Sequence, residues 1–239
     1  MPWRVATVVE TVAETAAART LVLDVPGWPG HHAGQHVDLR LTAEDGYQAQ
    51  RAYSIAAAPE DPRVAITVER LDDGEVSPYL VDDVREGDRI EVRGPIGGHF
   101  TWQAAQGGPL LLVGGGSGVV PLMSMLRHHA AARSDADARL LLSARGPEDV
   151  IYRDELEALD GGPVRVRIAL TRRRPPGWAG YDRRVDAAML AEVGPPPAER
   201  PMVFVCGPTG FVEVVADLLV DMGHRPLDIR TERFGPTGR

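Results

Sequence analysis

Two short stretches of the chain combine residue types that suit nucleotide chemistry. The first, Arg51-Ala52-Tyr53-Ser54, offers a cation, an aromatic ring and a hydroxyl within four residues. A guanidinium can pair with phosphate, a phenol ring can stack on a planar ring, and a hydroxyl can hydrogen-bond a heteroatom. On a strand, Arg51 and Tyr53 would face one way and Ser54 the other. The alternative interpretation is an exposed strand edge that binds nothing.

The second stretch is the glycine run Gly114–Gly118, which follows the apolar segment 109–113. Glycines allow a backbone to approach phosphates closely, and a following helix offers unpaired N–H groups and the positive end of its dipole. The run does not match G-x-G-x-x-G, because Val119 stands at the third glycine position, and no P-loop lysine follows. By itself it predicts either a phosphate site or a tight structural turn.

A basic segment and a single thiol complete the set of candidate residues. Residues 172–184 read RRRPPGWAGYDRR, with five arginines against one aspartate. Clustered arginines suit bidentate recognition of phosphate, although a solvated loop or a docking surface for an acidic carrier would look the same. Cys206 is the only cysteine. It can form no internal disulfide and cannot hold an iron–sulfur cluster, which needs about four ligands.

The composition narrows the classes of function. The 239 residues carry a net charge of −8, which argues against nucleic acid as a partner. Residues 109–126 are the one candidate membrane segment, but glycines and Pro121 interrupt the roughly 20 apolar residues that a spanning helix needs. The N-terminus lacks the pattern of a signal peptide. We expect a cytoplasmic protein with no membrane association and no metal site.

The first half of the chain must position these residues on short strands. Six segments rich in β-branched residues are separated by turn-forming residues, and they predict a small antiparallel barrel. One helix is expected at Ser77–Val81, with Ser77 as its N-cap and Pro78 at its first position. The six segments are WRVATVVE, RTLVLDV, QHVDLRLT, QRAYSIA, RVAITVERL and DRIEVRG.

After a linker at 103–108 the pattern changes. Apolar runs of four to six residues alternate with longer helix-compatible segments such as VVPLMSMLRHHAAA and GFVEVVADLLVDMG. This alternation is typical of βαβ units and a parallel sheet. We therefore predict two domains: an antiparallel β-barrel over residues 1–103, followed by an α/β parallel-sheet nucleotide-binding domain over residues 109–239.

The order of the motifs resembles that of the ferredoxin–NADP reductase family. In the first half the similar motifs are R-x-Y-S at 51–54, V-x-R at 68–70, G-x-x-S at 74–77 and G-D-x-I-x-V-x-G-P at 87–95. In the second half they are GGGSGVVPLMSML, SAR at 143–145, Thr171-Arg172, VCGPT at 205–209 and ERFG at 232–235. The resemblance covers nearly the whole chain. It implies a flavin in the barrel and NAD(P)H on the α/β domain, meeting at the interface.

The resemblance also implies roles for residues of the barrel. Arg51 would pair with the flavin phosphates, Tyr53 would pack on the ring, and Ser54 would approach flavin N5, with FAD favoured over FMN. Ala57 stands where a serine or threonine often follows R-x-Y-S, which weakens one flavin contact. The flavin-binding residues implied are Arg51, Ala52, Tyr53, Ser54, Thr67, Val68, Glu69, Gly74, Val76 and Ser77.

In the second domain the glycine run would cradle the pyrophosphate of NAD(P)H. Arg145 and Arg172 would contact an adenosine 2′-phosphate, which favours NADPH and leaves NADH open. The nucleotide-binding residues implied are Gly115, Gly116, Ser117, Gly118, Pro121, Ser143, Arg145, Thr171, Arg172, Cys206, Gly207, Pro208 and Thr209. The catalytic residues implied are Ser54, Cys206 near the hydride-accepting face, Glu232 as a proton or charge partner, and Phe234 stacked on the flavin. An ordinary structural role is the alternative for the last three.

The function implied is a reductase that passes a hydride from NAD(P)H to FAD. Electrons would then go to a separate carrier, such as a ferredoxin or another iron–sulfur or haem protein, because neither a fused ferredoxin module nor a globin fits the sequence. The first alternative is a diaphorase or free-flavin reductase with a small-molecule acceptor. The second is a flavin-binding sensor or coupling subunit without turnover.

Overall fold

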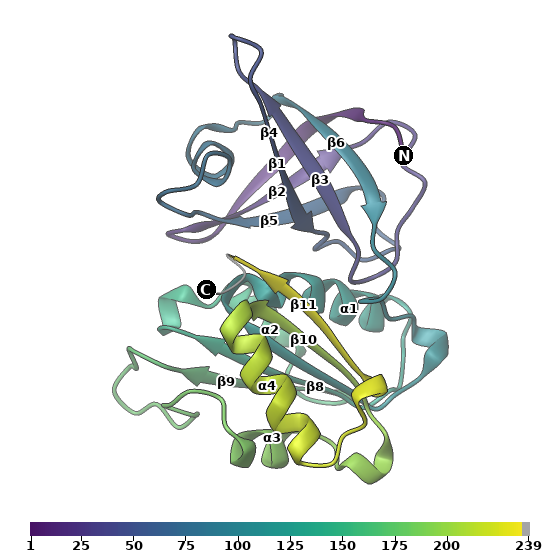
Figure 1. The fold of residues 1–239 in the computed structure, drawn as a ribbon, viewed down its shortest axis with the longest axis vertical. Helices are drawn as coiled ribbons and strands as arrows, with labels where there is room; N and C mark the ends of the chain where they lie inside the picture. The colour runs from purple at the N-terminus through teal and green to yellow at the C-terminus, as the bar shows by residue number, and fades with distance from the viewer. Residues whose placement is uncertain (236–239) are drawn as a thin grey trace.

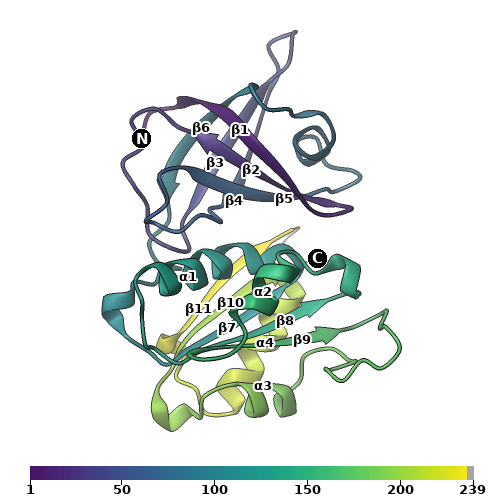
Figure 2. The same cartoon turned by 180° about the vertical axis from the view of Figure 1, so that it is seen from behind.

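The computed structural model describes residues 1–235, which form two stacked domains (Figures 1 and 2). The first is a six-stranded antiparallel sheet with the strand order β4-β3-β6-β1-β2-β5. This arrangement confirms the predicted antiparallel first domain. Its strands are β1 (Arg4–Thr15), β2 (Ala18–Asp24), β3 (His36–Thr42), β4 (Gln48–Ser54), β5 (Val64–Glu69) and β6 (Arg89–Ile96).

The two end strands of this sheet, β4 and β5, meet over a short distance only. They are joined by a bridge between Ile55 and Ile66 and by a hydrogen bond from the Ala56 N–H to the Ala65 carbonyl, 2.7 Å. Within residues 1–235 no further pairing links the two strands, so residues 51–54 and 67–69 flank an open seam. In the described part of the chain, this open seam is where the barrel wall is not closed by backbone hydrogen bonds.

The second domain is a five-stranded parallel sheet with the order β11-β10-β7-β8-β9, which confirms the predicted α/β class. Helices α1 and α2 cover the face toward the barrel, and α3 and α4 cover the other (Figures 1 and 2). The strands are β7 (Leu110–Gly115), β8 (Ala138–Ala144), β9 (Val164–Leu170), β10 (Met202–Pro208) and β11 (Ile229–Phe234). The helices are α1 (Val119–Ala131), α2 (Arg153–Leu159), α3 (Ala187–Val193) and α4 (Thr209–Asp221).

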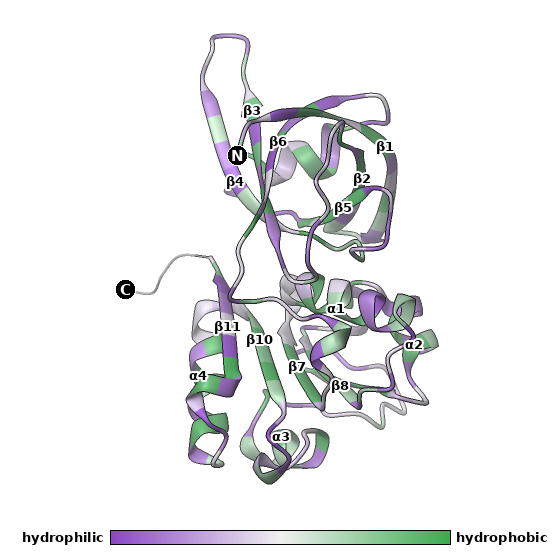
Figure 3. Ribbon diagram, turned by 90° about the vertical axis from the view of Figure 1, so that its right-hand side faces the viewer, coloured by the Kyte–Doolittle hydropathy of each residue, from purple (hydrophilic) through white to green (hydrophobic). Residues whose placement is uncertain are grey.

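The apolar run of β7 is explained by burial on both sides of the sheet. Leu110 and Leu112 join a buried cluster that continues through α1 into the barrel, whereas Leu111 and Val113 join the cluster under α3 and α4. A strand with two covered faces is hydrophobic throughout rather than alternating. Figure 3 shows β7 and β10 as mainly hydrophobic and the edge strand β11 as mainly hydrophilic. The shared cluster packs the two domains against each other.

The short helix after β5 differs from the prediction. It spans Tyr79–Asp83, and the Ser77 hydroxyl accepts a hydrogen bond from the Leu71 N–H, 3.0 Å, instead of capping the helix. The turn folds back so tightly at Gly74 that an added Cβ would lie 2.9 Å from the Ser77 oxygen. Ser77 therefore closes the turn. None of the helices in residues 1–235 is long and apolar enough to cross a bilayer.

Candidate functional site

The parallel sheet brings two of the predicted nucleotide segments together. Its strand order reverses between β7 and β10, because β8 and β9 extend the sheet on one side and β11 on the other. Ligands of open α/β sheets bind outside the carboxyl ends of the strands at such a reversal. The glycine run ends β7 and Cys206-Gly207-Pro208 ends β10, so both lie at this position.

The glycines of the run have different structural roles. Gly118 lies against the end of β10, where an added Cβ would stand 2.2 Å from the Cys206 carbonyl oxygen and 2.8 Å from the Gly207 Cα. A Cβ added at Gly115 would lie 2.9 Å from the Phe211 ring. Gly116 has φ +56°, and the nearest atom to its added Cβ is a Glu69 carboxylate oxygen at 3.8 Å. Packing explains Gly118 and Gly115, whereas Gly116 leaves its backbone accessible beside the open seam.

On the barrel side, the residues of the Arg51–Ser54 segment lie along one flank of the open seam. The exposed Arg51 guanidinium donates to Glu75 Oε2 at 2.8 Å. Glu75 also accepts from the Tyr47 hydroxyl at 3.2 Å. Tyr53 is half-buried against the core, and burial raises the pKa of its phenol to about 12. The ring therefore stays a neutral apolar surface at physiological pH.

The other flank presents mainly backbone. The Thr67 hydroxyl is engaged by Thr20 at 2.7 Å and by the Tyr152 hydroxyl of the second domain. Val68 is fully buried in the barrel core, as is Val76 beyond the strand. Of the predicted residues here, Thr67 and Val68 can offer only their main chain to a ligand, and Glu69 alone extends a side chain toward the glycine run.

Four polar residues line up where the two domains meet. Ser54 is the cross-strand partner of His36 on β3, and Cys206 is the cross-strand partner of Glu232 on β11. His36 Nδ1 and Glu232 Oε1 lie 3.7 Å apart and connect the two pairs across the domain boundary. His36 is the functional candidate that the sequence did not reveal. Only its register opposite Ser54 distinguishes it from a surface histidine.

Burial sets the protonation of this row. It raises the pKa of the Glu232 carboxyl to about 7, and Glu232 Oε2 is buried without a hydrogen-bond partner among residues 1–235. Burial lowers the pKa of His36, against the influence of Asp38. Burial and the Glu232 carboxylate raise the pKa of the Cys206 thiol. Near neutral pH the row therefore holds a neutral imidazole, a protonated thiol and a carboxyl that can gain or lose a proton.

We expect Glu232→Gln to remove a pH dependence of folding. The folded-state pKa of about 7 exceeds the ordinary 4.5, so the unfolded chain releases this proton first as the pH rises. Keeping this carboxyl in the fold therefore lowers the free energy of unfolding by an amount that grows from pH 4.5 to 7. Above pH 7 the loss stays constant, at on the order of 3 kcal/mol. The free energy of unfolding measured in urea should be the same for the variant and the wild type at pH 4.5, and higher for the variant at pH 8. The exposed Glu213→Gln should show no such pH-dependent gain; an equal gain for Glu232→Gln at both pH values would contradict the assignment.

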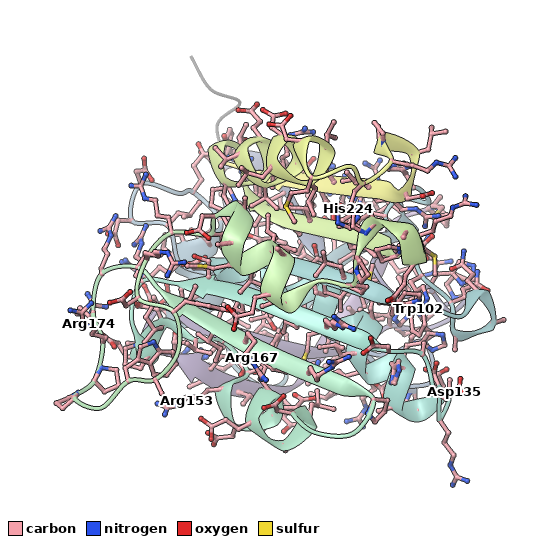
Figure 4. The ribbon with its side chains drawn as sticks, turned by 90° about the horizontal axis from the view of Figure 1, so that it is seen from below. Trp102, Asp135, Arg153, Arg167, Arg174 and His224 are labelled. Carbon is pink, nitrogen blue, oxygen red and sulfur yellow. The ribbon has the colours of Figure 1, made fainter. Side chains whose placement is uncertain are left out.

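In the structure, acidic side chains pair with three of the five arginines in the basic segment 172–184. Arg173 pairs with Glu148 and, at 2.8 Å, with Asp149; Arg174 and Arg183 pair with Asp182 and Asp186 at 2.6 and 2.7 Å. The prediction of one arginine cluster for phosphate thus overlooked acids from neighbouring turns. Arg174 lies in the loop at the rim of the domain, as Figure 4 shows. These three arginines are already neutralised.

Arg145 and Arg172 stand apart from that set. The Arg172 N–H donates to the Arg145 carbonyl at 2.9 Å, so the two residues adjoin at the ends of β8 and β9. Both side chains are exposed, and neither has an acidic partner within residues 1–235. Beside them, Thr171 donates its hydroxyl to the Ala144 carbonyl at 3.1 Å and holds the two strand ends together. Two adjacent guanidiniums without acids suit a phosphate.

The remaining predicted residues divide into accessible and buried groups. Pro121 is buried in the first turn of α1 and shapes the start of that helix. Thr209 opens α4 with its hydroxyl oxygen buried and without a partner in the described chain. Phe234 ends β11 opposite Pro208 with 36% of its surface exposed. Ser117 and Ser143 are partly exposed, whereas Gly207 is buried. Among residues 1–235 no group of three His, Cys, Asp or Glu could hold a metal ion.

A comparison of sequences decides the family. The chain is 41% identical over 211 residues to ferredoxin–NADP reductase B of Sorangium cellulosum, covering 84% of this chain and 84% of that protein. The chain belongs to the ferredoxin–NADP reductase family. Models of the oxidoreductase FAD-binding domain and the oxidoreductase NAD-binding domain match residues 6–102 and 112–217 of this reductase-family chain. It is thus an oxidoreductase with one domain for FAD and one for NAD(P).

Other similar proteins agree with this family. The chain is 33% identical over 235 residues to the glycine betaine monooxygenase reductase subunit of Pseudomonas aeruginosa. That match covers 96% of this chain but 63% of the length of that subunit. In structure, the chain resembles a ferredoxin–NADP reductase from Neisseria gonorrhoeae with bound FAD and NADP, with a TM-score of 0.83, 23% identity and coverage of 98% and 99% of the two chains. At that identity, the likeness shows the fold.

Proposed function

We propose that this chain is a flavoprotein reductase that takes a hydride from NADPH and passes electrons to a separate carrier protein. The observation that carries this proposal is the convergence of the open seam of the barrel with the β7–β10 strand ends, joined across the boundary by His36 and Glu232. The flavin domain is assigned to residues 1–103 and the nucleotide domain to residues 109–239. NADPH use and the reductase class favour a cytoplasmic location.

The residues of the open seam fit FAD. Residues 67–69 offer strand backbone that is unpaired toward β4, and Tyr53 offers a neutral ring. Arg51 offers an exposed guanidinium that donates to the Glu75 carboxylate and to the Gln50 carbonyl. Bound FAD would supply the chemistry of accepting a hydride and releasing electrons one at a time. Ser54 would hydrogen-bond the reacting edge of the ring, and Phe234 would cover the ring face from β11.

The strand ends fit the second nucleotide. Gly116 presents backbone with no side chain of its own, and Thr209 has a hydroxyl oxygen without a partner among residues 1–235, so both can face a phosphate or ribose. Arg145 and Arg172 would bind the adenosine 2′-phosphate. The protonated Cys206 would pack beside the nicotinamide without adding charge. Glu232, with its pKa near 7, would exchange a proton with solvent through the neutral His36.

Anaerobic reduction tests this function. The purified protein should be yellow, and NADPH should bleach it within seconds. Protein that takes up no flavin would contradict the proposal, and colour without bleaching would favour a sensor or coupling subunit. Bleached protein that reduces free flavin or ferricyanide, but no ferredoxin or oxygenase component, would favour a diaphorase. The names of the relatives point to ferredoxins and monooxygenase components as the acceptors to try.

Two substitutions at one ion pair should change FAD affinity in opposite directions. Arg51→Ala removes the proposed phosphate ligand, and we expect the FAD Kd to rise about 10- to 100-fold, the value of a charge-assisted hydrogen bond. Glu75→Gln removes the carboxylate that competes with phosphate for Arg51. Because an exposed pair contributes roughly 0.2–1 kcal/mol, the Kd should fall up to about fivefold.

The control for this pair is Glu44→Gln. Glu44 is exposed in the turn that joins β3 to β4, and its loss changes the net charge equally without freeing Arg51. Fluorescence titration of apoprotein with FAD measures all three variants. An equal gain from Glu44→Gln would show a long-range charge effect, and an unchanged Kd in Arg51→Ala would remove Arg51 from the site.

A further inference from the structure

Both flanks of the open seam are fixed to the second domain by hydrogen bonds from polar side chains at the domain boundary. Helix α1 lies between the barrel and the sheet (Figures 1 and 2). From it the fully buried Ser124 donates to the Ala57 carbonyl at 2.7 Å, and Arg127 Nη1 donates to the Ala56 carbonyl at 2.9 Å. Ala56 and Ala57 follow Ser54 by two and three residues, so α1 holds the exit of β4.

The other flank has its own attachment. The Tyr152 hydroxyl hydrogen-bonds Thr67 on β5, and Thr67 is itself bonded to Thr20 on β2. Tyr152 is fully buried and holds a left-handed backbone, with φ 61°, which non-glycine residues seldom adopt. This backbone conformation places the Tyr152 ring so that its hydroxyl reaches Thr67 across the domain boundary.

Arg127 connects the two attachments. Its guanidinium lies 4.8 Å from the centre of the Tyr152 ring and binds Glu155 with two nitrogens, at 2.9 and 2.6 Å. A cleft of about 590 Å³, lined by both domains, opens beside these residues, so apolar packing does not seal this part of the boundary. Apolar contacts are non-directional, whereas hydrogen bonds fix one register.

We propose that Ser124, Arg127 and Tyr152 are positioning residues for hydride transfer. They form a clamp, defined by these three side chains, that sets the open seam relative to the glycine run at the start of the same helix. None of the three clamp residues is itself a proposed nucleotide ligand; Tyr152 bonds the side chain of Thr67, whose main chain is what the strand offers to FAD. This inference rests on the proposed function and adds to it the part of the interface that fixes the donor–acceptor distance.

The test removes two hydroxyls without adding bulk. Ser124→Ala with Tyr152→Phe leaves the Thr67–Thr20 bond and the Tyr152 ring contact in place. Because a displacement of about 1 Å can cost 10²-fold in rate, we expect stopped-flow flavin reduction to slow about 10- to 100-fold at saturating NADPH. FAD content and the KM for NADPH should stay at wild-type values, and the isotope effect with 4-deuterated NADPH should rise.

Val215→Ala is the matched control. It removes apolar contacts from the cluster under α4, on the sheet face away from the barrel, and should lower stability while the reduction rate stays unchanged. A wild-type rate in the double variant, or a higher KM at an unchanged saturating rate, would overturn the clamp alone. So would an equal loss of rate in Val215→Ala. Failure of NADPH to bleach the wild-type protein would instead remove the proposed function, and this inference with it.

Discussion

Replacing Gly118 with alanine is expected to slow reduction of the flavin by NADPH roughly 100-fold while the protein still binds FAD. The new Cβ would lie 2.2 Å from the Cys206 carbonyl oxygen and 2.5 Å from its carbon. Both atoms belong to the buried strand β10, which is held by β7 and β11 and cannot move aside. The glycine run must therefore retreat from the strand end where the nicotinamide is proposed to lie.

The expected size of this effect is large. Overpacking against a fixed backbone costs about 3 kcal/mol in stability, and a shift of about 1 Å at the reacting groups lowers the rate roughly 100-fold. Thermal unfolding, bound FAD and stopped-flow reduction measure the three quantities. Gly98→Ala is the control, because Gly98 is exposed and its added Cβ would meet nothing within 4 Å. A Gly118→Ala protein with wild-type reduction would show that β10 and the glycine run are not fixed against each other.

The second large effect is expected for the double substitution Arg145→Ala with Arg172→Ala. These two guanidiniums adjoin at the ends of β8 and β9 without acidic partners in the described chain. If they bind the 2′-phosphate, kcat/KM for NADPH should fall roughly 100-fold while that for NADH stays unchanged. Each charge-assisted hydrogen bond is worth about 1.5–3 kcal/mol, and 1.4 kcal/mol corresponds to tenfold.

The neighbouring arginines provide the control for this experiment. Arg173 and Arg174 belong to the same sequence run but pair with Glu148, Asp149 and Asp182. Arg173→Gln with Arg174→Gln changes the net charge by the same amount, and we expect kcat/KM for NADPH to stay within about twofold. Equal or better use of NADH by the wild-type enzyme would rule out a 2′-phosphate site at Arg145 and Arg172.

Local patterns in the sequence account for the elements and their order. Short β-branched segments between turn residues predict the strands of the barrel, and apolar runs alternating with helical segments predict the parallel sheet. These patterns depend on which faces are buried, and in β7 burial on both faces produces an unbroken apolar run. The prediction that Ser77 caps the short helix was wrong, because the Ser77 hydroxyl accepts from the Leu71 N–H and closes the preceding turn.

Residues whose roles depend on distant partners were beyond such patterns. His36 belongs to none of the sequence motifs; strand register places it opposite Ser54, and β11 brings Glu232 to 3.7 Å from it. The RRR run looked basic until the turn after β8 supplied Glu148 and Asp149. In both cases the deciding contact joins residues far apart in the chain.

The sequence by itself determined two domains, their classes and the stretches from which we propose that the nucleotide sites are built. Those features follow from nearest-neighbour chemistry and from periodicity, which a linear chain carries in full. Only the tertiary structure decided which arginines stay unpaired, which glycine is required by a backbone contact, and where a carboxyl acquires a pKa of about 7. Electrostatic pairing, steric exclusion and desolvation act through space, so they are fixed only when the chain folds and brings distant residues together.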